Sequence, residues 1–459
     1  MNVDYIISNC QVVKPANTFH AAVAIKNGKI VLIGDQALMA ESGITAKNVI
    51  DAEGKYLLPG CIDPHMHVDW PDWETVSATR SSTKAAVAGG YTTVINFLNG
   101  TDTLEENFLS SKDCFEKNSY TDMAFHMAIF TDEQIKEIPR MAELGVSSFK
   151  FFLPYRGSEV VAPLKGIDDG TIYMGLKEIA KLNAPARALI HCENVELVFK
   201  LKEKYMGNEP EGLTWDDVRP PVCEIDGVRR ILTFSEDTGC PVYVVHTSTE
   251  EAVKDMQQAK GNGIDVRTET CVQYLTLMAT DYDRTLGKVN PPLRMDKRHL
   301  NALWDGINNG SVDTIGSDHA PCARKHKPDF WSAIVGMAGI QTLLPVLLSE
   351  GVNKGRITIN KVAEICSYNV AKTFGLTPQK GLLEIGSDAD LILVDLNKTV
   401  TVKAEDLYHI SDFSCFEGWE LTGSVDMTMI RGEIVMQNGK AMVEPGYARF
   451  LPRVAAPKE

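Results

Sequence analysis

The sequence of 459 residues lacks a long apolar run and lacks an excess of positive charge. A membrane-spanning helix needs about 20 consecutive apolar residues, so we expect no such helix. The net charge of −15 opposes binding to nucleic acid and to anionic membranes. The first residues, MNVDYIISNC, also lack the basic start and apolar centre of a signal peptide. We therefore expect a protein without nucleic-acid or membrane partners.

Closely spaced cysteine pairs are missing as well. The ten cysteines are scattered, and none stands in a Cys-x-x-Cys pair, the spacing typical of zinc and redox motifs. Scattered thiols of this kind are kept reduced in the cytoplasm, which is where we expect this protein. Most of the cysteines then serve as small buried hydrophobic residues.

The sequence does contain an alternation of apolar strands with helix-like segments. Helical patterns at 77–90, 132–145, 171–183 and 227–239 separate the strands. Eight successive β-then-α units predict an α/β fold, a parallel (β/α)8 barrel of the TIM type. We expect the eight barrel strands at residues 56–63, 91–97, 122–130, 146–152, 187–192, 241–247, 264–270 and 312–318.

Both ends of the chain carry short strands and tight turns instead. Alternating apolar residues lie near the start, around an Asn-Gly turn at 27–28, and again after residue 387, with a second Asn-Gly turn at 438–439. Strand-rich segments at opposite ends of a chain can pair, because domain termini tend to lie close together. The sequence therefore predicts a small β-sandwich domain built from both termini.

These patterns divide the chain into two domains. We expect the barrel at residues 56–376, and the β-sandwich domain at residues 1–55 and 377–459. The tail after about residue 445 is rich in proline and charge, so we expect it to pack loosely.

Polar residues stand where the predicted barrel strands end. Catalytic side chains gather at these carboxyl ends in a (β/α)8 barrel, because the loops converge there. Four of the ten histidines occupy such positions. The residues at the strand ends are His65, His67, Lys150, His191, His246 and Asp318.

The histidines and the aspartate form a set of candidate metal ligands. His65 and His67 are two residues apart on a strand, so both imidazoles face the same side. Neutral imidazole binds zinc, cobalt or manganese, and Asp318 adds an oxygen ligand. A single histidine at a strand end is more often a hydrogen-bonded core residue. Four of them together with an aspartate predict a metal site.

Lys150 is the unusual member of this set, since it lies in the apolar segment SSFKFF. A buried ammonium group is costly and would repel nearby divalent cations. A buried lysine loses its proton more easily, and the neutral amine can take up carbon dioxide to form a carbamate. This anion has two oxygens that can bridge two metal ions. The alternative is a lysine that extends from the barrel rim to solvent, but the surrounding histidines favour the carbamate.

These residues, in this order, resemble the metal-binding motif of the amidohydrolase superfamily. Within it, the chain is similar to the cyclic amidohydrolases, such as hydantoinase, dihydropyrimidinase and allantoinase. The similarity extends over nearly the whole chain. It includes the segments LLPGCIDPHMHVD, SSFKFFLPY, HCEN, TETCVQYLTL, VNPPLR, GSDHAPC and FEGWELTG.

This resemblance implies a hydrolase that opens a hydantoin or dihydropyrimidine-type ring by attack of a hydroxide bridging two divalent metal ions. It favours zinc, with manganese or cobalt as alternatives, and it implies a homotetramer or homodimer. Asp318 would act as general base and then general acid, Tyr155 would polarise the scissile carbonyl, and Asn290 would bind the substrate ring. One ion would be held by His65, His67 and Asp318, the other by His191 and His246, and both by Lys150 as N6-carboxylysine.

The substrate is less sharply defined. The segment 71–94 is similar to allantoinases, whereas Tyr155 in FFLPY is typical of hydantoinases, so we favour a hydantoinase-type enzyme with allantoinase as the alternative. Dihydroorotases usually carry an arginine soon after the His-x-His motif, and Val68-Asp69-Trp70 stands here instead. Non-catalytic relatives of dihydropyrimidinase that serve as partner proteins have lost metal ligands, whereas all six positions are filled in this chain.

Two features of the sequence bear on the substrate pocket. Asn290 stands where hydantoinases and dihydropyrimidinases commonly have serine, which puts the usual ring contacts in question. Trp70, Trp73 and Phe152, with the loop 154–172, are candidates to surround a ring substituent, although simple packing would also explain each of these aromatic residues.

Overall fold

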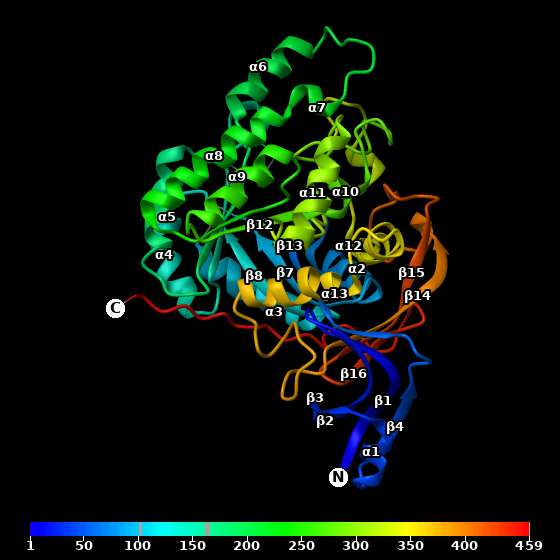
Figure 1. Ribbon diagram of the computed structural model, residues 1–459. Helices are drawn as coiled ribbons and strands as arrows, with labels where there is room; N and C mark the ends of the chain where they lie inside the picture. Colours follow the sequence, from blue (N-terminus) through cyan, green and yellow to red (C-terminus); the bar gives the residue numbers. More distant parts are fainter. Residues whose placement is uncertain (101–102, 161–165, 459) are drawn as a thin grey trace.

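The computed structural model describes residues 1–100, 103–160 and 166–458. At its centre, eight parallel strands follow in the order β13-β12-β11-β10-β9-β8-β7-β6 (Figure 1). The two end strands meet, because Met66 in β6 forms a parallel bridge with His319 just after β13. The result is the expected barrel, nearly closed. Its strands are β6 (Cys61–Met66), β7 (Tyr91–Leu98), β8 (Asp122–Ala128), β9 (Ser148–Phe152), β10 (Arg187–His191), β11 (Val242–Val244), β12 (Val266–Cys271) and β13 (Thr314–Gly316).

Helices surround the barrel, so most of its strands are buried on both faces. Strand β7, for example, has the sequence YTTVINFL and every residue in it is buried, a composition typical of parallel sheets. The four helices expected from the sequence are confirmed as α2, α4, α5 and α8. The helices are α1 (Gln36–Glu41), α2 (Thr75–Ala88), α3 (Leu104–Asn118), α4 (Asp132–Glu143), α5 (Asp169–Ile179), α6 (Val195–Tyr205), α7 (Trp215–Val218), α8 (Pro221–Thr238), α9 (Glu250–Gly261), α10 (Val272–Thr276), α11 (Lys297–Asn309), α12 (Ile340–Val346), α13 (Ile359–Ala363) and α14 (Asn369–Thr373), with short 3-10 or π turns η1 (Gly157–Glu159), η2 (Arg324–His326), η3 (Leu347–Asn353), η4 (Glu364–Tyr368) and η5 (Ala404–Asp406).

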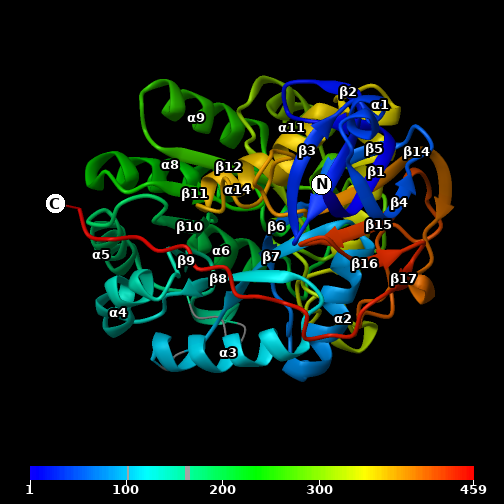
Figure 2. The same ribbon diagram turned by 90° about the horizontal axis from the view of Figure 1, so that it is seen from below.

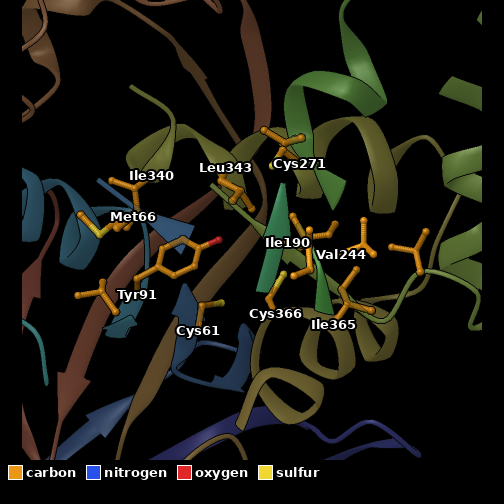
Figure 3. Close-up of a cluster of buried hydrophobic side chains, with 14 of the residues drawn as sticks. Cys61, Met66, Tyr91, Ile190, Val244, Cys271, Ile340, Leu343, Ile365 and Cys366 are labelled. Carbon is orange, nitrogen blue, oxygen red and sulfur yellow. The ribbon is translucent and has the colours of Figure 1, made fainter. Parts of the chain in front are cut away.

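Apolar side chains from the strands and the surrounding helices form one large core. Met66 and Tyr91, from neighbouring strands, belong to it together with Ile340 and Leu343 of α12 (Figure 3). The π turn η4 contacts both β6 and β13, the two strands that meet at the seam of the barrel. This seam is therefore covered by the C-terminal part of the chain.

The two ends of the chain form a second, mostly antiparallel sheet beside the barrel (Figure 1). Its order is β17-β16-β15-β14-β5-β1-β2-β3, with β4 paired to β1. Strand β5 links the termini, because it pairs with β1 on one side and with β14 on the other. The expected fold class is thus confirmed. The strands are β1 (Asn2–Val13), β2 (Thr18–Lys26), β3 (Lys29–Gly34), β4 (Thr45–Asp51), β5 (Tyr56–Pro59), β14 (Leu391–Thr401), β15 (Glu420–Ile430), β16 (Glu433–Gln437) and β17 (Lys440–Ala441).

Both Asn-Gly turns expected in this sheet are present. Asn27 and Gly28 connect β2 and β3 with φ angles of 51° and 75°, and Asn438 and Gly439 connect β16 and β17 with 48° and 71°. Left-handed conformation at both turn residues matches the right-handed twist of the flanking strands and favours the Asn-Gly pair.

The prediction of a single strand over residues 56–63 is wrong. Strand β5 ends at Pro59, β6 begins at Cys61, and the two belong to different sheets. Gly60 stands between them, and a Cβ at this position would overlap the side chain of Thr92. The apolar run continues through Gly60 without a break in the sequence, although the chain passes there from one sheet to the other. The exact domain boundaries stay predictions.

The C-terminal tail contradicts a second expectation, because it packs closely against the barrel. Seen from below, it crosses the amino ends of β8 and β9 towards α5 (Figure 2). Phe450 forms a parallel bridge with Met123 of β8, and the Leu451 N–H donates to the Met123 carbonyl at 2.7 Å. Further along, the Asn183 N–H donates to the Ala456 carbonyl at 2.8 Å. The tail is a strap across the floor of the barrel.

Arg453 anchors this strap in the barrel interior, where its side chain is only 1% exposed. The guanidinium donates to Ser148 Oγ at 2.9 Å and to the Phe125 carbonyl. Ser148 Oγ also lies 2.6 Å from His126 Nδ1. Burial lowers the pKa of Arg453 to about 9, which still leaves it charged at neutral pH.

All ten cysteines are free thiols and nine of them are buried, as expected. Within the described ranges, none of the helices combines the length and the apolar character that a membrane crossing requires. The cellular compartment and the oligomeric state stay predictions.

Arg453→Ala should destabilise the fold. The change removes the donor to Ser148 Oγ and the Phe125 carbonyl and opens a cavity in the barrel floor, with an expected loss of about 2–4 kcal/mol, measured as a lower melting temperature by calorimetry. Arg449→Ala is the matched control, because this exposed side chain lies four residues earlier in the same tail and should change stability by about 0.5 kcal/mol or less. Equal melting temperatures for the two variants would contradict the anchoring role of Arg453.

Candidate metal centre

Three side chains from the two ends of the barrel sheet converge at the carboxyl ends of the strands. His65 and His67 come from β6 and the residue after it, and Asp318 follows β13. The Nε2 atoms of the two histidines lie 3.3 Å apart. Asp318 Oδ1 lies 3.2 Å from His65 Nε2 and 3.7 Å from His67 Nε2. Atoms at these separations can share one cation, whose bonds to nitrogen and oxygen are about 2.0–2.2 Å long.

Two more histidines lie beside this group. His191 ends β10 and His246 follows β11, and His191 Nδ1 is 3.1 Å from His246 Nε2. The rings of His65 and His246 have centroids 5.3 Å apart, so the two groups are contiguous. His246 and Asp318 both have left-handed backbone, with φ angles of 39° and 48°, a conformation that is uncommon and clusters at functional sites.

Buried glutamates determine which ring nitrogen faces the centre. His65 Nδ1–H donates to Glu269 Oε1 at 2.6 Å, which leaves the lone pair on Nε2. His191 Nε2–H donates to Glu193 Oε2 at 2.7 Å, which leaves the lone pair on Nδ1. Carboxylate partners of this kind orient histidine ligands in metal sites.

Sequence reasoning missed both glutamates, although each leaves a signal. Glu193 follows two residues after His191 in the segment HCEN, and Glu269 is a charged residue inside the buried strand β12, as Lys150 is inside β9. Burial raises the pKa of Glu193, but Arg219, which donates to it at 2.7 Å, outweighs that effect and holds the pKa at about 2. Glu193 is therefore a permanent carboxylate partner for the imidazole.

The four imidazoles are uncharged. Burial lowers the pKa of His65, His67 and His246 well below the usual value, and it lowers that of His191 as well. Ring nitrogens of neutral imidazoles thus lie 3.1 and 3.3 Å apart, with His65 Nε2 and His191 Nδ1 as acceptors. Such a donor set fits divalent metal ions that prefer imidazole and carboxylate ligands.

Lys150 lines the same cavity, and its side chain is fully buried. The alternative of a lysine that reaches solvent is therefore wrong. Its Nζ has no hydrogen-bond partner among the residues that the structure describes, and burial lowers its pKa to about 8. An amine without a described partner, partly deprotonated near neutral pH and next to candidate metal-ligating nitrogens, fits the expected carbamate.

A small cavity of about 40 Å³ opens at these residues. All eight residues singled out for the site from the sequence line it, Tyr155 and Asn290 among them. The lining residues are His65, His67, Trp70, Lys150, Phe152, Tyr155, His191, His246, Val289, Asn290, Asp318, Ala320, Val335 and Gly336.

Of the three aromatic residues expected around a ring substituent, two line this cavity and one does not. Trp70 and Phe152 line the cavity, whereas Trp73 lines a neighbouring one. Residues 161–165, which belong to the loop expected to shape the pocket, lie outside the described residues. Among the described lining residues there is no arginine, in agreement with the missing arginine after the His-x-His motif.

The model of the amidohydrolase family matches residues 56–435, a range that contains every residue of the candidate centre. The chain belongs to the amidohydrolase family. Metal binding is consistent with this family. The resemblance found in the sequence is therefore confirmed.

The relatives of this amidohydrolase match it over almost its full length. It is 35% identical to an allantoinase of Desulfitobacterium hafniense (strain Y51), over 96% of this chain and 97% of the relative. It is 34% identical to a D-hydantoinase of Geobacillus stearothermophilus, over 98% and 96%. Its fold is similar to the solved structure of an L-hydantoinase (dihydropyrimidinase) from Arthrobacter aurescens, with a TM-score of 0.91 at 30% identity over 98% and 100% of the chains. The cyclic amidohydrolase branch is thus confirmed.

Lys150→Ala should lower the metal content of the purified amidohydrolase, measured by mass spectrometry of the bound metal. Metal-free wild-type protein given zinc and bicarbonate should regain metal faster at pH 9 than at pH 7. A group with a pKa of about 8 is about one tenth neutral at pH 7 and about nine tenths neutral at pH 9, and only the neutral amine forms a carbamate. The alanine variant keeps every other ligand and should show no response to bicarbonate. A normal metal content in this variant would remove the bridging role of Lys150.

Proposed function

We propose that this amidohydrolase opens a cyclic amide ring with water, using two divalent cations held at the strand ends. The observation that carries the proposal is the set of facing imidazole nitrogens beside the buried amine of Lys150. Zinc is the preferred ion, and manganese or cobalt are alternatives. His65, His67 and Asp318 would hold one ion, His191 and His246 the other, and carboxylated Lys150 both.

Asp318 is the proposed proton carrier of the reaction. Bound cations would lower the pKa of a water molecule towards about 7 and polarise the amide carbonyl. The Asp318 carboxylate lies 3.2 Å from His65 Nε2, so it would stand beside a water molecule held by the cations and within reach of its proton. Asp318 would take this proton from the attacking water and return it to the leaving ring nitrogen.

The Tyr155 hydroxyl is the proposed donor to the oxygen of the scissile carbonyl. Its ring lies beside His191, with centroids 5.4 Å apart. Burial raises the pKa of Tyr155 above the usual value, so the hydroxyl stays protonated and remains a donor throughout the physiological range. A donor already in place stabilises the negative charge that develops on this oxygen.

We favour a hydantoin or dihydropyrimidine-type ring as the substrate, with allantoin as the alternative. Relatives named D-hydantoinase and allantoinase are 34% and 35% identical to the chain, so similarity supports both. Trp70 and Phe152 line the cavity and would lie beside the ring. Dihydroorotate is less favoured, because no arginine stands on the described wall to bind its carboxylate. A non-catalytic partner role is less favoured, because all six ligand positions are filled.

The protein loaded with zinc, manganese or cobalt should open at least one ring among hydantoin, 5-phenylhydantoin, dihydrouracil, allantoin and dihydroorotate. Asp318→Ala should lower kcat on the best of these by about 100- to 10,000-fold, because proton transfer to the leaving nitrogen is lost. Asp69→Asn is the control, since this carboxyl group lines the neighbouring cavity, and it should leave kcat nearly unchanged. Wild-type rates from Asp318→Ala would exclude Asp318 as the proton carrier.

Tyr155→Phe should lower kcat by about 100- to 1,000-fold, because the donor to the developing oxyanion is lost. Its metal content should equal that of the wild type. Tyr173→Phe makes the same chemical change on the outer helix α5, where the hydroxyl donates to Asp237 at 2.6 Å, and should not affect kcat. Equal kcat values for Tyr155→Phe and Tyr173→Phe would contradict the proposed role of Tyr155.

A further inference from the structure

Asn290 lies between Tyr155 and Trp215, a tryptophan of the short helix α7 outside the barrel strands. Trp215 Nε1–H donates to Asn290 Oδ1 at 2.8 Å, and both side chains are buried. An indole N–H is only a donor, so the amide oxygen of Asn290 must face Trp215 and its NH2 group must face away. On that side lies Tyr155, which lines the same cavity; burial raises the pKa of its hydroxyl, and the neighbouring Asn290 amide partly offsets this rise. Trp215 thus determines which end of the amide is presented to the cavity.

Trp215 is itself held in one orientation. It begins the short helix α7, where the N–H and the hydroxyl of Thr214 both donate to Asp217 at 2.8 Å. Lys288 Nζ lies 4.1 Å from the centroid of the indole ring, and Phe330 packs edge-on at 5.6 Å. The indole is 6% exposed and lines a neighbouring cavity on one side, so these contacts and the bond to Asn290 hold its orientation.

We propose that Trp215 is a specificity-determining residue of the ring-opening reaction, because it fixes the Asn290 amide as a hydrogen-bond donor on the cavity wall. The NH2 group of this amide is turned away from Trp215 and is therefore available to the substrate on the wall that Asn290 shares with Tyr155. Trp215 does not line the cavity and acts through Asn290, so it is a positioning residue. This inference rests on the proposed function and deepens it by naming a feature of the substrate.

A fixed donor selects a ring that presents an oxygen acceptor at this point. Cyclic imides and ureides carry a second carbonyl oxygen besides the one that is attacked, whereas a simple lactam has none. A lactam would leave the buried N–H without a partner, which weakens binding by about 10- to 100-fold. Without the indole N–H the amide can turn and present its oxygen, so the selectivity for imides and ureides depends on Trp215.

A double-mutant cycle tests this coupling on the metal-loaded protein and the ring that the wild type opens best. Trp215→Phe keeps an aromatic ring but removes the N–H, and should lower kcat/KM by about 10-fold, mainly through KM. In an Asn290→Ala background the same change should lower it by about twofold or less. Trp331→Phe is the matched control, because this neighbouring tryptophan donates to Glu209 instead. An equal loss in both backgrounds would show that Trp215 acts only through packing and would overturn the proposal.

Two rings that differ only in one oxygen or sulfur atom test whether the enzyme selects substrates with a second carbonyl oxygen. In 2-thiohydantoin or 2-thiodihydrouracil, the carbonyl oxygen that is not attacked becomes sulfur, which is a weaker acceptor. The ratio of kcat/KM for the oxygen ring to that for the sulfur ring should fall by about 10-fold from wild type to Trp215→Phe. The metal content of each variant separates an effect on the substrate from a loss of metal. An unchanged ratio overturns this inference alone, whereas a wild-type protein that opens no ring overturns the proposed function and this inference with it.

Discussion

Two pairs of imidazole nitrogens face each other at 3.3 and 3.1 Å in a buried cavity, and burial keeps the rings uncharged. In each pair the His67 or His246 nitrogen either donates a hydrogen bond to the lone pair of its neighbour or turns its own lone pair towards a shared cation. Glu269 and Glu193 hold the outer ring nitrogens of His65 and His191, so these two rings keep their lone pairs directed into the cavity. The rest of the fold therefore holds nitrogen acceptors in place before any cation binds.

Strand β9 shows how a single element connects the floor of the barrel to its mouth. Ser148, Lys150 and Phe152 alternate along the strand and share its inner face. Ser148 meets Arg453 of the C-terminal tail, while Lys150 and Phe152 line the cavity with the histidines. The anchor of the tail and the proposed metal bridge are thus two residues apart. One short strand thus contacts both the tail and the candidate site.

The barrel and the clustering of the candidate metal ligands were predictable because both follow from local patterns. A spacing of two residues on a strand places the His65 and His67 side chains on the same face. A lysine inside an apolar strand, such as Lys150, is unusual and can be recognised in the sequence. Arg453 gave no such signal, because its neighbours in the tail look solvent-exposed and only the folded barrel supplies its partners. Trp215 meets Asn290 through a contact between segments far apart in the sequence, and no local pattern predicts that pair.

The second sheet has a consequence for synthesis of the chain. Strand β5 pairs with β14, and all the barrel strands lie between these two strands in the sequence. On the ribosome, β5 emerges long before β14 is translated, so one of its edges lacks a partner throughout synthesis of the barrel. Unpaired strand edges recruit other strands and cause aggregation. Residues 56–59 are therefore a strand edge of the nascent chain that stays exposed to other strands until β14 has been translated.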